Sequence, residues 1–402
     1  MTSEWHEVPL RELVGYISKG IAPSYAEEAS ETTIRVLNQK CNRNFRISYG
    51  DSRLHDTLKK KVPPERYVKP DDILINSTGA GTAGRIAQIE DVPSTTTIDG
   101  HMILIRSNGK VTQKFLGYAL KAHQWEVLQL DEGSTGQTEL NRDRLLDEIM
   151  INYPVSLDEQ NAIVGTLESI DRKLIVNEQL NDNLEQQAQA IYHERFETVS
   201  PNGLPSEWRI VTLGEVATIS NKSFNPMKEP EILLEHYSIP AFDEARFPVF
   251  ELSTSIKSNK FIIDASCFMI SKLNPTTKRV WKPYCLTGNA VCSTEFIVYK
   301  AKDKTITDFL YSVIDSNSFS DFMCSHVTGS TGSRQRTTPS DTLSYELILP
   351  SEDELAEFQS LVSPMYAQIR INAIENDRLK RLRDSLLPKL MSGEIDVSTI
   401  QL

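Results

Sequence analysis

The chain has 402 residues, of which 39% are apolar and 24% are charged, and its formal net charge is −12 at pH 7. This composition is typical of globular protein, and the length is sufficient for two or three domains. It excludes a membrane-spanning protein, because no apolar run reaches the roughly 18 residues that a membrane helix needs. The five cysteines form no CxxC pair, so we expect reduced thiols in a cytoplasmic protein.

The negative charge is concentrated in two segments. Residues 154–196 carry a net charge of −5 and residues 351–402 a net charge of −3, whereas segments 1–153 and 197–350 each carry −2. An acidic chain at first argues against nucleic acid as a ligand. The two near-neutral segments still leave room for local basic faces, and we expect the acidic segments to face protein instead of phosphate.

The sequence repeats itself once. EWHEVPLRE at residues 4–12 corresponds to EWRIVTLGE at 207–215, and a Gly-Ser-Thr-Gly loop at 133–136 returns at 329–332. Between these landmarks the halves diverge. A single duplication at this period predicts two similar domains related by pseudo-two-fold symmetry, because a solenoid needs at least three units.

Each half contains the same order of predicted elements. Two apolar strands and one short helix recur, at residues 72–75, 101–105 and 115–120 in the first half and at 267–270, 295–299 and 309–314 in the second. We therefore expect an α+β fold with two mixed α/β domains of about 150 residues each.

Two long helices follow the two halves. Residues 157–196 contain no proline, and their apolar residues recur at alternating spacings of four and three, which is the heptad pattern of a coiled coil. The same seam returns 195 residues later. Its members are Ile163, Leu167, Ile170, Leu174, Leu184, Ala188 and Ile191 in the first helix, and Phe358, Val362, Met365, Ile369, Leu379 and Leu386 in the second.

The seam includes two polar positions. Asn177 and Asn181 in the first helix match Asn372 and Asn376 in the second. Because a buried Asn is stable only with a partner, it fixes register, and we predict that the helices face each other as an antiparallel coiled coil about 60 Å long. Pro388 and Gly393 are expected to end the second helix. The alternative is that both helices pack inside one globular domain.

Two loops in each half carry groups suited to DNA, since cations and backbone amides hold phosphates while polar side chains reach base edges. The first loop follows the strand at 72–75 or 267–270, and its candidates are Asn76, Ser77, Thr78 and Arg85 in one half and Lys272, Lys278 and Arg279 in the other. The second is the Gly-Ser-Thr-Gly loop, with candidates Ser134, Thr135 and Gln137, and Ser330, Thr331, Arg334 and Arg336. Further phosphate contacts are possible at Lys19, Arg43, Arg46 and the lysines at 59–61. Alternatively, the second loop is an ordinary turn and the lysine run a solvated surface.

Catalytic motifs are missing from the sequence. TGAGTAG at 78–84 lacks the ending of a phosphate-binding loop, and Asn274-Pro275 lacks the Pro-aromatic continuation of an amino-methyltransferase signature. The seven histidines show no metal-ligand spacing, and there is no GxSxG. We therefore expect no catalytic site, no bound metal and no cofactor.

The repeat, the Gly-Ser-Thr-Gly loops, the run PVSLDEQ at 154–160 that opens the first helix and LLPKLMSGEI at 386–395 together resemble one family. The chain resembles type I restriction–modification specificity subunits over nearly its whole length. Residues 350–355 (PSEDEL) depart from the pattern because they lack its Glu-Gln ending.

This resemblance implies two target-recognition domains, at 1–155 and 198–350, and two spacer helices that dock methyltransferases, at 156–197 and 351–402. It also implies a non-catalytic subunit that reads a bipartite, asymmetric site in double-stranded DNA and directs two methyltransferase subunits and the restriction subunits to it. The alternatives are a coiled-coil scaffold that binds no DNA and a cryptic nuclease.

Overall fold

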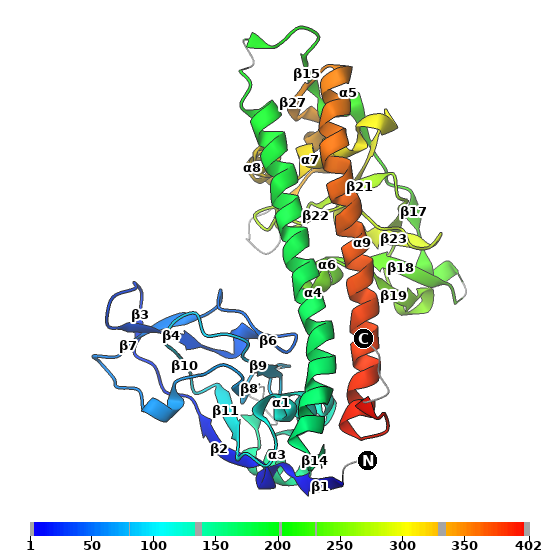
Figure 1. Cartoon of the computed structure of the whole chain (residues 1–402). Helices are drawn as coiled ribbons and strands as arrows, with labels where there is room; N and C mark the ends of the chain where they lie inside the picture. The colour runs from blue at the N-terminus through cyan, green and yellow to red at the C-terminus, as the bar shows by residue number, and fades with distance from the viewer. Residues whose placement is uncertain are drawn as a thin grey trace. The chain divides into compact units, whose positions relative to one another are not determined.

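The computed structural model describes residues 4–79, 81–132, 139–200, 203–229, 231–328 and 335–397 (Figure 1). The chain forms two compact units, one of Met1–Lys173 with Lys380–Leu402 and one of Leu174–Leu379. Each long helix contributes to both units. The four segment boundaries expected from the sequence stay a prediction.

The described residues of unit 1 form two four-stranded sheets and three strand pairs. The first sheet is antiparallel, in the order β2 (Val14–Lys19), β11 (Met102–Ser107), β8 (Ile73–Asn76) and β9 (Ile86–Gln88). The second has the order β10 (Thr96–Ile98), β4 (Thr33–Leu37), β7 (Arg53–Asp56) and β3 (Tyr25–Ala26), with β10 parallel to β4. β1 (Trp5–Pro9) pairs with β14 (Met150–Pro154), β5 (Asn42–Arg43) with β6 (Arg46–Ile47), and β12 (Asp131–Glu132) with β13 (Glu139–Leu140).

Three short helices complete unit 1, namely α1 (Gln113–Ala122), α2 (Gln124–Leu128) and α3 (Arg142–Glu148). α1 begins after Thr112, whose hydroxyl accepts a hydrogen bond from the amide of Phe115, as an N-cap does. β8 is an apolar run buried on both faces, because one face meets the helices and the other meets a second group of apolar residues.

Unit 2 repeats this frame. Its antiparallel sheet has the order β16 (Ala217–Ile219), β24 (Phe296–Ala301), β21 (Cys267–Ser271) and β22 (Val280–Trp281). Its second sheet has the order β17 (Ser223–Phe224), β20 (Lys260–Ile262), β23 (Ala290–Ser293), β18 (Leu233–Tyr237) and β19 (Val249–Leu252), again with one parallel pair, β18 and β23. β15 (Arg209–Thr212) pairs with β27 (Glu346–Leu349), and β25 (Val327–Thr328) with β26 (Arg336–Thr337). The short helices are α5 (Leu213–Val216), α6 (Ile239–Ala245), α7 (Thr307–Ile314) and α8 (Asn317–Ser325).

The predicted elements are confirmed in both halves. The strands expected at 72–75 and 267–270 are β8 and β21, those at 101–105 and 295–299 are β11 and β24, and the short helices are α1 and α7. In each half the two strands are antiparallel neighbours in the four-stranded sheet. The predicted α+β class, with two β-rich domains and two long helices, is thereby correct.

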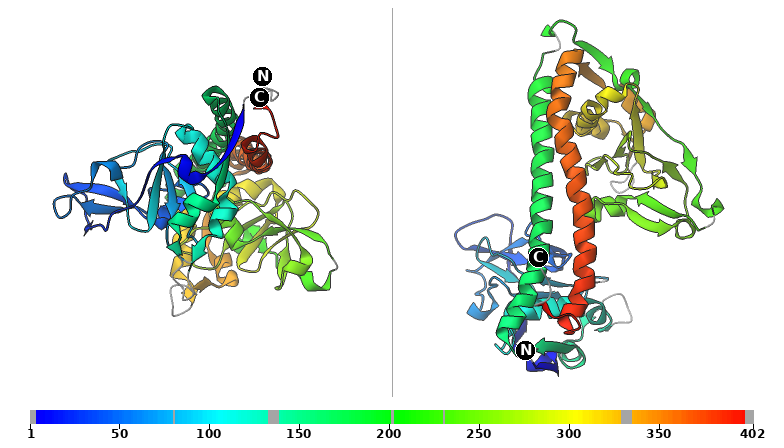
Figure 2. Two further views of the ribbon diagram at one scale, coloured as in Figure 1. Left: turned by 90° about the horizontal axis from the view of Figure 1, so that it is seen from below. Right: turned by 45° about the vertical axis from the view of Figure 1, so that its right-hand side comes forward.

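The long helices are α4 (Leu157–Tyr192), continued by a π-helical turn at His193–Glu197, and α9 (Glu352–Met391). Within unit 2 they lie side by side (Figure 2). Asn177 bonds Asn376 and Asn181 bonds Asn372, so residue numbers rise along one helix while they fall along the other. The helices are therefore antiparallel, as predicted. Every predicted seam residue is buried or half-buried.

One detail of α9 differs from the expectation. The helix does not end at Pro388 but continues to Met391, and Gly393 follows it with φ +76°. Proline removes one backbone donor from the helix, but the carbonyl of Pro388 still accepts from the amide of Ser392 at 3.0 Å, so the helical bonding continues past it. A glycine in the left-handed conformation just beyond the last turn is a common helix ending.

Candidate nucleic-acid interface

In unit 1 the first candidate loop is paired through its backbone with the residues that follow the second. Thr78, two residues beyond β8, forms an antiparallel bridge with Glu139, the first described residue after the Gly-Ser-Thr-Gly loop. The amide of Leu140 donates to the carbonyl of Ser77 at 2.8 Å. The loop after β8 is therefore paired with Glu139 and Leu140, which follow the Gly-Ser-Thr-Gly segment in the sequence.

Unit 2 contains the same pairing. Leu273, two residues beyond β21, bridges Arg336, and the amide of Thr337 donates to the carbonyl of Lys272 at 3.1 Å. A further hydrogen bond of 2.9 Å runs from the amide of Asn274 to the carbonyl of Gln335. The two halves share a backbone frame whose side chains differ, with Thr78 and Glu139 in one and Leu273 and Arg336 in the other.

The first-half candidates divide into structural and exposed groups. Asn76 and Ser77 are fully buried, and the Asn76 side chain donates to the carbonyl of Gln39 at 3.1 Å, so these two side chains support the loop from inside. Thr78 shares a hydrogen bond of 2.6 Å with the ring of His101. Arg85 is exposed, and its guanidinium donates to the carbonyl of Gly81 at 3.3 Å. Among the first-half candidates that the structure describes, Arg85 is thus the one whose side chain is exposed.

Three of the second-half cations are held by carboxylates. Arg279 forms two hydrogen bonds with Asp243, at 2.5 and 2.8 Å, and its side chain is largely buried. Lys278 lies 3.0 Å from the carboxylate of Asp315, whose pKa is raised by burial against the opposing effect of that lysine.

Arg336 makes two contacts with Glu295, at 3.0 and 3.1 Å, and the hydrogen-bonded carboxylate raises the pKa of the guanidinium. For Lys272, the part of the chain that the structure describes shows no ion pair. If these three paired cations contact DNA, each must either bind DNA and its carboxylate at the same time or release the carboxylate.

Six candidates lie outside the described residues, namely Ser134, Thr135, Gln137, Ser330, Thr331 and Arg334. Of the possible phosphate contacts, Lys19 pairs with Glu139, and Arg43 lies 4.0 Å from Asp51. Lys59 is 3.8 Å from Asp56, and Lys60 donates to the carbonyl of Ala22.

Sequence reasoning missed the residues that fix the first-half loop. Gln124, at the start of α2, donates to the carbonyl of Gly84 at 2.8 Å and accepts from the amide of Ile86 at 2.9 Å. Asn42 donates from its side chain to the carbonyl of Arg85 at 2.8 Å. Gly84 has φ +83°, and a Cβ there would lie 2.9 Å from the carbonyl oxygen of Val127. A single Asn or Gln gives no sign in the sequence that it holds a loop, because its hydrogen-bond partners are set by the fold.

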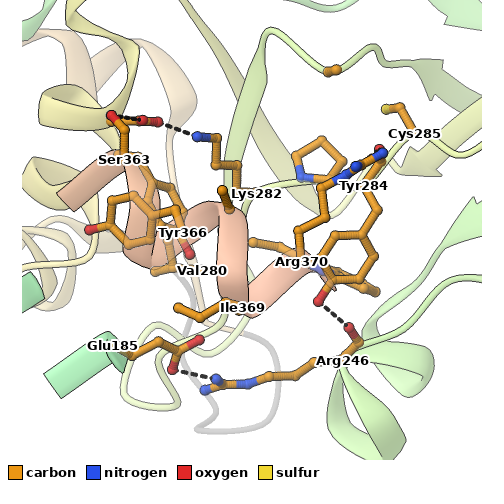
Figure 3. Close-up of a pocket in the computed structure, with 16 residues that line it drawn as sticks. Glu185, Arg246, Val280, Lys282, Tyr284, Cys285, Ser363, Tyr366, Ile369 and Arg370 are labelled. Carbon is orange, nitrogen blue, oxygen red and sulfur yellow. Dashed lines mark hydrogen bonds and ion pairs between the residues drawn. The ribbon is translucent and has the colours of Figure 1, made fainter. Parts of the chain in front are cut away.

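A separate cavity of about 350 Å³ lies within unit 2 (Figure 3). Its lining charges are largely compensated, because Arg246 pairs with Glu185 at 2.6 Å and Lys282 pairs with Asp308. Arg370 donates to the carbonyl of Tyr284 at 3.1 Å. The contacts of Glu185 and Arg370 tie α4 and α9 to the β-rich domain of the same unit.

Two features are absent from the part of the chain that the structure describes. No group of three or more His, Cys, Asp or Glu side chains is placed to hold a metal ion. No described helix is long and apolar enough to cross a membrane.

Comparisons with known proteins agree on one class. Residues 2–186 match the family model of the type I restriction modification DNA specificity domain. The specificity subunit of the type I restriction enzyme MjaIX from Methanocaldococcus jannaschii is 25% identical over 384 residues, covering 88% of this chain and 84% of the relative. The HindI specificity subunit from Haemophilus influenzae is 33% identical over 93 residues, or 23% of this chain and 20% of the relative.

The fold has a solved counterpart. The crystal structure of a type I restriction–modification S subunit from M. genitalium aligns with a TM-score of 0.58 at 15% identity, covering 97% of this chain and 96% of that one. Fold, repeat and family match define a specificity subunit of a DNA restriction–modification system. Residues 2–186 thus match the specificity domain family, and the chain is similar to type I restriction–modification specificity subunits over most of its length, as its sequence predicted, which favours this class over a scaffold of another class. Subunits of this class are in general not enzymes; they recognise DNA as part of a type I system.

Proposed function

We propose that this subunit reads a bipartite, asymmetric site in double-stranded DNA, one half with each β-rich domain. The observation that carries the proposal is the repeated pairing of the two candidate loops. Ser77 and Leu140 in one half, and Lys272 and Thr337 in the other, make the same backbone hydrogen bond. A common frame with unlike side chains suits two half-sites of different sequence, because base identity is read by side chains reaching the groove.

We further propose that α4 and α9 set the distance between the half-sites and dock two methyltransferase subunits. Val176 on α4 and Ile371 on α9 support the docking role. They lie 195 residues apart, immediately before the equivalent residues Asn177 and Asn372, and their exposed fractions are 49% and 54%. Two equivalent apolar positions on antiparallel helices suit two copies of one partner.

The remaining partners follow from the class. Restriction subunits complete the complex, and the methyl transfer and DNA cleavage belong to the partner subunits. Because DNA and these partners lie in the cytoplasm, we place the chain there.

Methylation mapping tests the proposal. The chain is expressed with its methyltransferase partner, and methylated positions are determined across the host genome. We expect a single motif with two fixed halves separated by an unspecified spacer. Methylation without sequence preference, or a motif with one continuous core, overturns the proposal.

A variant of Arg279 assigns one half-site. Arg279→Ala is expected to relax or lose the second-domain half-site and to leave the other intact. Because Arg279 is bound to Asp243, the matched control is Asp243→Asn, which weakens the ion pair but keeps the cation. Equal loss in both half-sites with Arg279→Ala contradicts the assignment.

A further inference from the structure

In both halves, the start of the second short helix lies beside the loop after the central strand. Gln124 begins α2 and bonds the backbone at Gly84 and Ile86. In unit 2, Asp315 lies two residues before α8 and holds Lys278 of the corresponding loop. In each half, the exposed side of the first turn of this helix therefore lies next to the candidate interface.

Trp125 occupies this outward side in unit 1. Its exposed fraction is 74%, whereas Val127, two residues further along α2, is fully buried. Trp281 in unit 2 is buried, and Trp5 and Trp208 are half-buried. Leaving so large an apolar ring in water is unfavourable, and tryptophan is enriched among the residues that dominate binding interfaces.

The position of Trp125 relative to Arg85 is fixed by close packing. The missing side chain of Gly84 lets the loop backbone touch the backbone of α2 at Val127, and Gln124 adds two hydrogen bonds between the same segments. A Cβ on Gly81 would meet no atom within 4 Å, so this part of the loop faces open space. An exposed ring and an exposed guanidinium are thus presented on neighbouring, mutually braced segments.

The corresponding helix of unit 2 is different. The exposed residues at the start of α8 are Asn317, Ser318 and Asp321, none of which is aromatic. The two helix starts therefore share a location beside the loop and differ in chemistry. This difference matches what two unlike half-sites require.

We propose that Trp125 is a DNA-contacting residue that helps to determine the first half-site. Its ring packs against a thymine methyl group or the edge of a base in the groove while Arg85 holds phosphate or guanine beside it. The inference rests on the proposed DNA-reading function. DNA is favoured over a protein partner because the loop braced against α2 is also paired with the end of the Gly-Ser-Thr-Gly segment.

The test uses the complex with the methyltransferase subunits and a DNA duplex that carries the mapped site. Trp125→Ala is expected to weaken binding about tenfold to a hundredfold, which is the range for loss of the contacts to one base pair. Trp125→Phe is expected to restore most of the affinity. The dependence of affinity on salt is expected to stay unchanged, because the indole neutralises no phosphate. Asn317→Ala is the matched control on α8, for which any change is confined to the second half-site.

Two outcomes overturn this inference. In one, Trp125→Ala binds the duplex as tightly as the unmodified complex. In the other, Trp125→Ala fails to assemble with the methyltransferase subunits in the absence of DNA, which assigns the ring to a protein contact. If the unmodified complex itself shows no sequence preference, the proposed function has failed before the variants are compared.

Discussion

The side chain of Asn177 on α4 donates a hydrogen bond to the side-chain oxygen of Asn376 on α9 at 2.8 Å, and both residues are buried. The equivalent pair, Asn372 and Asn181, repeats the bond at 2.8 Å. Apolar layers on the same helices lie toward either end, with Ala188 packed near Phe358 in one core and Leu167 near Leu390 in the other. The four amides form a polar layer in an otherwise apolar seam, and a shift of register would separate them.

The first prediction concerns this pair. Asn177→Leu removes the donor to the buried side-chain oxygen of Asn376 and is expected to lower the free energy of unfolding by about 1 to 3 kcal/mol. Asn177→Leu combined with Asn376→Leu is expected to recover most of that loss, because both polar groups are then removed together. Denaturant unfolding of the four proteins in a double-mutant cycle measures the coupling. A coupling energy near zero contradicts the pairing.

The second prediction separates the half-sites by their accessible cations. Arg85→Ala is expected to change recognition of the first half-site and Lys272→Ala that of the second. If Arg85 binds guanine, Arg85→Ala costs about 1 to 3 kcal/mol at one base position, and Arg85→Lys does not rescue it because the bidentate fork is lost. Methylation mapping of each variant reads out the motif. A uniform change across both half-sites contradicts the prediction.

The third prediction concerns pH and lies within unit 1. Asp171 on α4 accepts from Tyr118 at 2.8 Å and pairs with Lys121 at 3.2 Å and Arg383 at 3.0 Å. Burial alone raises the pKa of this carboxyl, but the two cations and the tyrosine outweigh burial and hold the pKa below its usual value. Its contribution to stability is therefore present above about pH 4 and is lost as the pH falls through the lowered pKa.

Asp171→Asn is accordingly expected to lower the free energy of unfolding by about 3 kcal/mol at pH 7, because Lys121 and Arg383 lose their counter-charge. The difference from the unmodified chain is expected to shrink below about pH 4. Thermal unfolding across a pH series measures both. Asp147→Asn, which breaks an exposed pair with Arg11, serves as the control with a smaller effect. A deficit that is constant over all pH values shows that charge is not the cause.

The repeated order of strands and helices could be predicted from the sequence, because the spacing of apolar residues that indicates each element is a local pattern. Seam spacing placed the four asparagines correctly, and the apolar runs located β8 and β21. The state of the cations was not predictable. Arg279 is bound by Asp243, 36 residues earlier in the sequence, and Arg336 by Glu295, 41 residues earlier. Such ion pairs depend on how loops meet in three dimensions. The identity of a single residue does not reveal its partner.

The fourth prediction concerns partner docking. Val176→Glu and Ile371→Glu each place a charge on one of the two equivalent apolar positions of α4 and α9. Each variant is expected to remove one of two methyltransferase subunits, because burying an unpaired carboxylate at an interface is costly. Native mass spectrometry of the assembled complex gives the ratio of subunits. Ile371→Leu keeps an apolar side chain and should retain both copies. If both charged variants still bind two methyltransferase subunits, these positions are not part of the docking surface.

The fifth prediction tests the long helices as a ruler. The two compact units divide between Lys173 and Leu174 on α4 and between Leu379 and Lys380 on α9. Inserting one seven-residue repeat at both places preserves the seam and lengthens each helix by about 10 Å, at about 1.5 Å per residue. This length corresponds to about three base pairs at 3.4 Å each.

The doubly extended chain is therefore expected to methylate a site whose halves are unchanged and whose spacer is longer by about three base pairs. Insertion into α4 alone is the control, because it lengthens only one of the two helices at the boundary between the units. The helix pairing of both units then cannot be kept in register, and activity should be abolished. Methylation mapping distinguishes these cases. If the doubly extended chain keeps the original spacer, the helices do not measure the gap, and the distance between half-sites must be set by the partner subunits or by bending of the DNA.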